Sequence, residues 1–221
     1  MRRNHARRTA PPAPAALRCG GDADRLARRI LVEAAPVLSG DKPAMLIALR
    51  NCGRVPATRR SDRFFCRHRE KLVAALGLRA RVLRRTPRGC LALFFDPARL
   101  AARLAEPEVA RFLSDRGYPA GADAALDRLE AAFAAGAESC PHEVGVFLGY
   151  PVRDVAGFIE RPGEALSVRR ALWRVFAPAG ESLRLMARIR AARERAMAVL
   201  AFESDALDAC AKLRRLPPLP A

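Results

Sequence analysis

Residues 140–159 read CPHEVGVFLGYPVRDVAGFI and contain a pair with chemical potential, His142 followed by Glu143. A zinc protease of the HExxH type needs a second histidine four residues after the first, and that position is a valine here. Glu143 has a structural interpretation instead. If Cys140 caps a helix and Pro141 opens it, the carboxylate falls at the third helical position, where it can accept a free backbone N–H. We therefore expect Glu143 to cap a helix.

His142 has no such structural role and is a candidate site residue. On a helix, Gly145 and Gly149 would follow it along one face and leave a trough beside the imidazole. The trough receives either the backbone of a neighbouring element or a small ligand, and in the second case Tyr150 joins the site. Because an imidazole can donate or accept a proton, His142 is also the one weak candidate for a general acid or base. The sequence leaves open whether the protein is an enzyme, and it identifies no cofactor.

Two rare residues are further candidates for the same ligand site. Only three of the 40 basic residues are lysines, and a lysine kept among so many arginines suggests a role that guanidinium cannot serve. Lys42 is the lysine that stands apart from other basic side chains, so we include it. Trp173 is the only tryptophan of the chain, and we include it too. An ordinary surface position for Lys42 and a core position for Trp173 are the alternatives.

The cysteines predict neither disulfides nor a metal centre. The six cysteines include no C-x-x-C pair, which is typical of reduced thiols in the cytoplasm. Two Cys-x-His pairs, Cys66 with His68 and Cys140 with His142, could in principle form a tetrahedral zinc site. A single intervening residue is not the usual spacing of structural zinc ligands, so no metal site is predicted.

The positive charge is concentrated in the first half of the chain. Residues 1–95 carry 22 basic and six acidic residues, a balance of +16 within a total of +17. Such a region could bind nucleic acid through phosphate contacts, or could simply be a solvated arginine-rich surface. The candidate nucleic-acid contacts are Arg79, Arg81, Arg84 and Arg85. The 140–159 segment also has helix-turn-helix spacing, but its second helix lacks outward base-reading residues, so nucleic acid is not the favoured partner.

The pattern of elements predicts an α+β fold, a mostly helical single domain with a small antiparallel sheet. Alternating residues around a TPRG turn indicate a hairpin at about 78–95, with one face buried and one rich in arginine. Residues 166–177 look like a strand around Trp173. We expect residues 1–23 to be a disordered arm rich in Arg, Pro and Ala, 24–203 to be the domain, and 204–221 to be a short helix with a Pro-rich tail. No apolar run is long enough for a membrane span and no secretory signal is recognised, which favours a cytoplasmic location.

Several segments resemble a bacterial family, the domain-of-unknown-function family 3793. They are APVLSGDKPAMLI, the hairpin, EPEVARFLSDRGYP, CPHEVGVFLGYPVRDVAGFIE and LWRVFAPAGESLRLMARIR. The order of elements resembles that family from residue 29 to about 195. The resemblance implies the order of the elements and no established activity. It would place a cysteine and a glycine where this chain has Val168 and Ala171. A likeness of such proteins to flavodoxin-like redox proteins further suggests a redox-protein partner.

Together these observations favour a small-ligand or partner-protein binding module with its site beside the 140–151 helix. A basic protein associated with nucleic acid is the alternative, and an enzyme using His142 is a third hypothesis.

Overall fold

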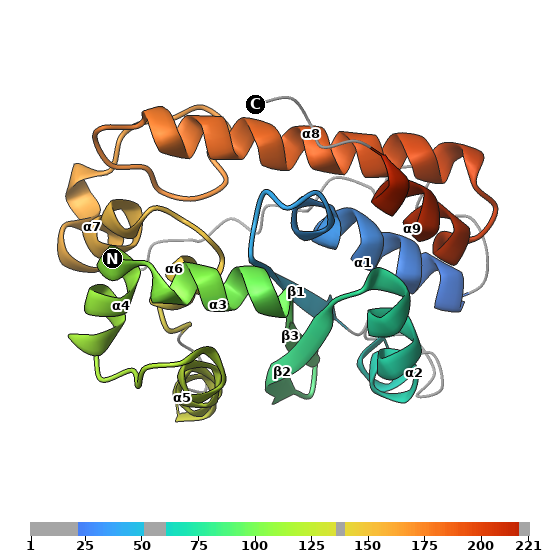
Figure 1. The fold of residues 1–221 in the computed structure, drawn as a ribbon, viewed down its shortest axis with the longest axis horizontal. Coiled ribbons are helices and arrows are strands. Elements are labelled where there is room, and N and C mark those ends of the chain that lie inside the picture. Colours follow the sequence, from blue (N-terminus) through green and yellow to red (C-terminus); the bar gives the residue numbers. More distant parts are fainter. Residues whose placement is uncertain (1–21, 51–60, 136–139, 217–221) are drawn as a thin grey trace, which may run out of the picture.

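The structure is a computed structural model that describes residues 22–50, 61–135 and 140–216 (Figure 1). As predicted, helices surround a small antiparallel sheet. The strands are β1 (Ala44–Arg50), β2 (Arg79–Thr86) and β3 (Gly89–Phe95). The helices are α1 (Asp22–Leu38), α2 (Ser61–Leu76), α3 (Pro97–Ala105), α4 (Pro107–Ser114), α5 (Ala122–Ala135), α6 (Val144–Phe147), α7 (Val152–Glu160), the 3-10 helix η3 (Pro162–Glu164), α8 (Gly180–Phe202) and α9 (Ala206–Arg215).

The sheet has the order β1-β3-β2, and both strand pairs are antiparallel. The predicted hairpin is β2 and β3. Residues 45–49 lie in β1 and pair with β3. The apolar sequence of β3, GCLALFF, reflects its central position, because a strand covered on both faces has no solvent-facing side.

The side chains on the two faces of the sheet belong to two separate hydrophobic clusters. On one face Phe94 of β3 packs with α1, α2, α9 and the second half of α8. On the other face Leu93 packs with the helices from α3 to α7. This division follows from the alternation of side chains along a strand. Helix α8 runs along one side of the molecule past both halves (Figure 1).

The hairpin has no open arginine-rich face, contrary to the prediction. Strand β2 contacts α5 on one side and α2 on the other, and Leu83 is fully packed in the cluster beneath α5. A bulge between Val82 and Arg84 shifts the register, so the alternation read from the sequence does not continue through the strand. The arginines consequently lie on both faces.

Residues 166–177 form no strand. A single bridge joins Leu166 to Val175, and between them Arg170 has a left-handed backbone with φ of 57°. The N–H of Phe176 donates to a side chain rather than to a neighbouring strand. The segment is therefore an irregular loop that returns to α8.

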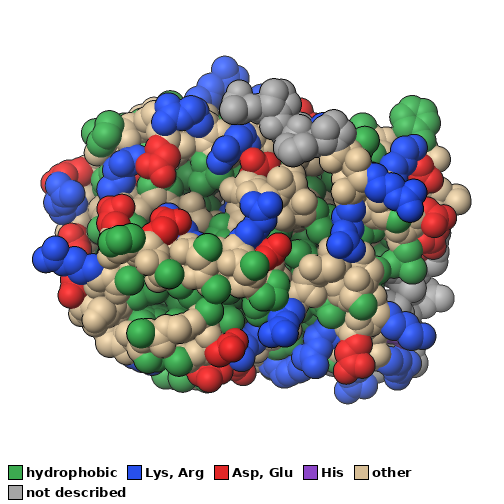
Figure 2. Space-filling model, in the orientation of Figure 1, with side chains coloured by type: hydrophobic (Ala, Val, Ile, Leu, Met, Phe, Trp, Pro, Cys, Tyr) green, Lys and Arg blue, Asp and Glu red, His purple; other side chains and the backbone are tan. Residues whose placement is uncertain are grey.

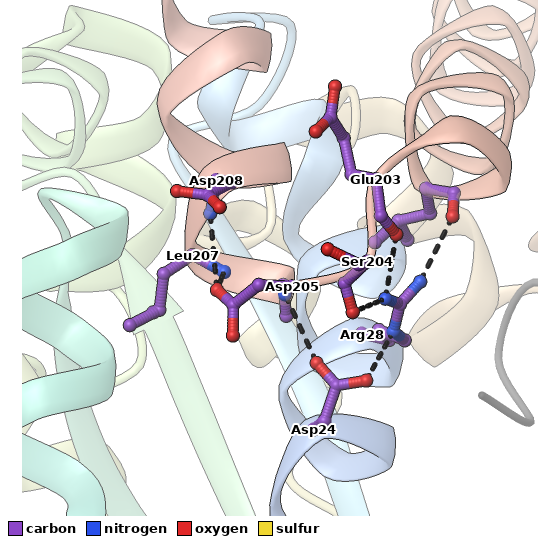
Figure 3. A network of polar contacts seen from close by, with 9 residues as sticks. Asp24, Arg28, Glu203, Ser204, Asp205, Leu207 and Asp208 are labelled. Atoms are coloured by element: carbon purple, nitrogen blue, oxygen red, sulfur yellow. Dashed lines mark hydrogen bonds and ion pairs between the residues drawn. The ribbon is translucent and has the colours of Figure 1, made fainter. Parts of the chain in front are cut away.

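A buried arginine joins the two ends of the described chain (Figure 3). Arg28 of α1 is 1% exposed. Its guanidinium donates to Asp24 Oδ2 at 2.5 Å and to the main-chain oxygens of Leu200, Glu203 and Ser204 at 3.0, 2.8 and 2.5 Å. Leu200 lies in the last turn of α8, where a helix leaves its last C=O groups without intrahelical partners, and Glu203 and Ser204 follow the helix. Asp24 in turn accepts from the first amide of α9, at Ala206.

Helix α9 contributes Ala209 and Cys210 to the cluster around α1, so it packs into the fold beyond residue 203. Of the arm predicted over residues 1–23, residues 1–21 lie outside the described residues and residues 22 and 23 begin α1. Residues 217–221 of the predicted tail also lie outside the described residues. Among the helices that are described, none combines the length and apolar character that crossing a membrane requires.

Candidate ligand-binding site

The segment around His142 forms a short helix pair. Helix α6 begins only at Val144, later than predicted. The opening amides bond to backbone oxygens, Val144 N to Pro141 O at 3.2 Å and Gly145 N to His142 O at 3.0 Å. Glu143 has helical backbone angles and its side chain makes no capping hydrogen bond. The prediction that Glu143 caps the helix is therefore wrong, because a tight turn satisfies these amides from the main chain.

Neighbouring side chains fill the space beside both glycines of the expected trough. A Cβ on Gly145 would lie 2.6 Å from a methyl carbon of Val155 in α7. A Cβ on Gly149 would lie 2.6 Å from Cδ of Pro43, just before β1. Gly149 also has φ of 79°, which lets the chain turn from α6 into α7. The glycines thus permit close packing on two different sides of the segment.

Gly149→Ala should lower the free energy of unfolding by about 2 kcal/mol, since it adds both backbone strain and a clash with Pro43. Gly117→Ala is the matched control, because Gly117 has φ of 73° and a Cβ added there would have no described neighbour within 4 Å. We expect that control to lose only about 1 kcal/mol. Urea denaturation followed by circular dichroism measures both variants, and equal losses would show that the contact with Pro43 costs nothing.

A pocket of about 280 Å³ opens beside the glycine-lined helix. Four residues predicted from the sequence line it, His142, Gly145, Tyr150 and Trp173. The remaining lining residues are Cys140, Val144, Asp154, Val155, Phe158 and Arg174. The other two predicted residues, Lys42 and Gly149, line a different cavity. The structure therefore brings four of the six together and separates the rest.

Aromatic rings in two pairs form much of the pocket wall. Tyr150 and Trp173 stack with centroids 4.2 Å apart and planes 17° apart. His142 meets Phe158 edge to face at 4.7 Å and 88°. The guanidinium of Arg174 lies 5.5 Å from the centroid of the Phe158 ring. Such an arrangement offers flat apolar surfaces and ring edges to a ligand, with a cation at the rim.

A buried carboxylate fixes the tryptophan. Asp154 of α7 is 2% exposed. Its Oδ2 accepts from Trp173 Nε1 at 2.7 Å and from Ser182 Oγ at 2.5 Å, and its Oδ1 accepts from the N–H of Phe176 at 2.9 Å. Sequence reasoning missed Asp154. The available signal was an acidic residue between Val152 and Val155 on the apolar face of an amphipathic helix, since a buried carboxylate requires several donors.

The ionisable groups of the pocket favour binding over nucleophilic chemistry. Burial raises the pKa of the Cys140 thiol, so the thiol stays protonated at neutral pH and is a poor nucleophile. Burial likewise raises the pKa of Tyr150. Within the ranges it describes, the structure gives the imidazole of His142 a ring contact with Phe158 and no hydrogen-bond partner, whereas a catalytic imidazole is usually oriented by one.

Lys42 is buried next to Tyr150 and outside the pocket. It is 1% exposed, and its Nζ lies 3.5 Å from Met45 Sδ and 4.6 Å from the centroid of the Tyr150 ring. Burial, and then the charge of Arg193, lowers the pKa of Lys42 to about 7. One tyrosine ring thus contacts both Lys42 and Trp173, which makes Lys42 a support of the pocket wall.

The depressed pKa of Lys42 predicts a rise in stability with pH. An unfolded lysine holds its proton until about pH 10.5 and the folded one loses it near 7, so unfolding takes up a proton between these values. We expect the free energy of unfolding to rise on the order of 1 kcal/mol per pH unit from about pH 7 to 9. Above that range Cys140 and Cys210, whose pKa values are raised, oppose the trend. Lys42→Met should abolish the slope, and the exposed control Lys71→Met should keep it.

The structure does not bring the two Cys-x-His pairs close to each other. Cys66 and His68 lie on α2, and Cys66 Sγ accepts from Arg85 at 3.0 Å. Cys140 and His142 lie beside α6, in the half of the fold that packs on the other sheet face. In the described ranges, no three His, Cys, Asp or Glu side chains come together as a metal site would require.

The four hairpin arginines have different surroundings. Arg81 forms ion pairs with Asp127 and Glu130 of α5, and Arg84 lies 5.5 Å from the centroid of Phe133 on the same side. Arg85 lies on the α2 side with Cys66, and Arg79 is exposed at the start of β2. Basic side chains do gather over β2 and α2 on the face shown in Figure 2. Arg81 is nevertheless already paired with acidic residues.

The fold and site define a mostly helical α+β domain with a small aromatic pocket. A family model described as protein of unknown function, DUF3793, matches residues 30–208. That range is more than half of the chain, so the protein belongs to this family, which confirms the resemblance seen in the sequence. No curated protein and no solved structure matches the chain. The antiparallel sheet differs from the parallel sheet of flavodoxin-like proteins, so the expected likeness to them is absent from the described fold.

Proposed function

We propose that the protein is a binding module for a small, flat, largely apolar ligand, held in the pocket beside His142. The observation that carries this proposal is the aromatic pocket itself, in which Trp173 is locked in place by Asp154. Ligand sites are commonly apolar, partly aromatic hollows with a few fixed polar groups. Here His142 and Arg174 supply polar groups at the rim.

The size and chemistry of the pocket restrict the ligand. At about 280 Å³ it lies near the lower limit of small-molecule sites, so a ligand of one ring suits it better than a nucleotide. Stacked and edge-on rings favour an aromatic plane over an aliphatic one. A neutral amide or similar group would suit the imidazole of His142, which can donate or accept a hydrogen bond.

The single tryptophan gives a direct test, because Trp173 lines the pocket and is the only residue of its kind in the chain. Benzamide and nicotinamide should change its fluorescence in a saturable way, and cyclohexanol should have a much weaker effect. Phe158→Ala should weaken the response at least fivefold. Phe202→Ala is the matched control, since Phe202 is 86% exposed at the end of α8. An unresponsive Trp173, or equal effects of the two variants, would count against the pocket.

The nucleic-acid alternative rests on the +16 balance of residues 1–95, much of which lies outside the described residues. The hairpin arginines do not form one open face. Phosphate recognition by this half of the protein remains a prediction that salt-dependent filter binding can test.

A further inference from the structure

A second cavity, of about 910 Å³, lies between α3 and α8. The Gly40–Pro43 turn forms its third wall. No residue that lines it also lines the pocket beside His142. Its volume falls within the range of small-molecule sites, so this cleft can take a larger ligand than the aromatic pocket.

Two pairs of arginines line the cleft. Arg99 and Arg103 are one turn apart on α3, and Arg184 and Arg188 are one turn apart on α8. Residues four apart share a helix face, so each helix presents two guanidinium groups to the cleft. Blue and red side chains lie interspersed over this region in Figure 2.

The acidic residues of the cleft are already paired. Asp41 lies 3.2 Å from Nε of Arg188, Glu106 pairs with Arg103, and Glu181 pairs with Arg153, which is not part of the cleft lining. With these acidic side chains engaged, not every arginine of the cleft has an acidic partner. The structure gives the side chain of Arg184 no partner within the ranges it describes.

Arg99 is a second arginine with donor groups open to the cleft. Arg99 is 55% exposed, donates to Gly40 O at 3.0 Å and lies 3.8 Å from Asp96. Arg103 lines the cleft but is engaged, because its guanidinium donates to Tyr150 O at 2.8 Å and pairs with Glu106, and its Nε is buried. A guanidinium offers two parallel N–H groups that match the oxygens of a carboxylate or phosphate. Apart from Lys42, the remaining lining is apolar and includes Ala102, Leu185 and Ala191.

We propose that this cleft is a second binding site, for a small organic oxyanion whose charged group meets Arg184 and Arg99 and whose apolar body lies against Leu185. This site goes beyond the ligand pocket proposed above and is independent of it. A phosphate and a carboxylate share the chemistry that the guanidinium groups recognise.

Isothermal titration calorimetry at low and at physiological salt tests the cleft with phenyl phosphate, benzoate and the neutral benzyl alcohol. We expect one or both anions to bind and to weaken with salt, and benzyl alcohol to bind at least tenfold more weakly. Arg184→Ala should reduce anion affinity at least fivefold. Arg215→Ala, which removes an exposed arginine of α9, should leave the affinity unchanged.

A preference for phenyl phosphate or for benzoate supports the proposal and names the oxyanion. Equal binding of benzyl alcohol would overturn it, as would equal affinities in Arg184→Ala and Arg215→Ala. Anion binding that is lost in Phe158→Ala and kept in Arg184→Ala would also overturn it, because the anion would then occupy the pocket beside His142. Circular dichroism of each variant checks that the substitution leaves the fold intact.

Discussion

Asp154→Ala is expected to lower the free energy of unfolding by about 3–5 kcal/mol. The substitution leaves the Trp173 indole N–H, the Phe176 amide and the Ser182 hydroxyl without their acceptor in a nearly dry environment. It also releases the loop that carries Trp173 from α7. We therefore expect the pocket to lose ligand affinity together with stability.

Two controls separate the charge of Asp154 from its geometry. Asp154→Asn keeps one carbonyl acceptor and should lose less stability than the alanine variant. Ser182→Ala removes a single hydrogen bond and should lose about 1 kcal/mol. Urea denaturation followed by far-ultraviolet circular dichroism gives all three values. A loss below about 1 kcal/mol for Asp154→Ala would show that these contacts do not hold the loop.

Arg28→Ala is the second large effect, with an expected loss of about 3–5 kcal/mol. It deprives the end of α8 of the donor that satisfies its last carbonyls, and it leaves Asp24 with a charge that has lost its partner (Figure 3). The positive charge near a helix C-terminus is also lost. Because the same side chain joins α1 to α8 and Asp24 extends the contact to α9, we expect unfolding to remain cooperative at lower stability.

Arg28→Lys is the informative companion variant. Lysine keeps the charge, but its single ammonium cannot reach a carboxylate and three carbonyls with the geometry of a guanidinium. It should recover less than half of the loss. The exposed variant Arg215→Ala should change stability by less than about 0.5 kcal/mol. If Arg28→Lys has the same free energy of unfolding as the wild type, the positive charge alone stabilises the helix end, and the several donors of the guanidinium are not needed.

Local features of the fold could be predicted from the sequence. The order Asp96-Pro97 is a sequence signal for the start of a helix, and in the structure Asp96 accepts from Arg99 N at 3.0 Å at the start of α3. These signals work because a cap acts within one turn of its own helix. The hairpin was likewise predicted, whereas the environment of its arginines was not, since the bulge and the covering helices arise from contacts distant in sequence.

The candidate site could also be predicted only in part, because sequence signals report local structure and not contacts between distant residues. His142, Gly145 and Tyr150 share one short segment, so their proximity follows from local structure. Trp173 joined them because it was rare, and Asp154, which actually positions it, was not recognised. Lys42 was chosen for its rarity and is indeed buried beside Tyr150, but on the side of the second cavity. Which side of a ring a distant residue occupies depends on tertiary packing.

Native mass spectrometry of the protein purified from its own host tests the central claim most directly. We predict a wild-type species heavier than the 24.1 kDa chain by the mass of one small molecule, released on denaturation. Phe158→Ala should lose this added mass and Phe202→Ala should keep it. A wild-type spectrum with the mass of the chain alone, or added mass that survives in Phe158→Ala, would contradict a ligand in the pocket beside His142.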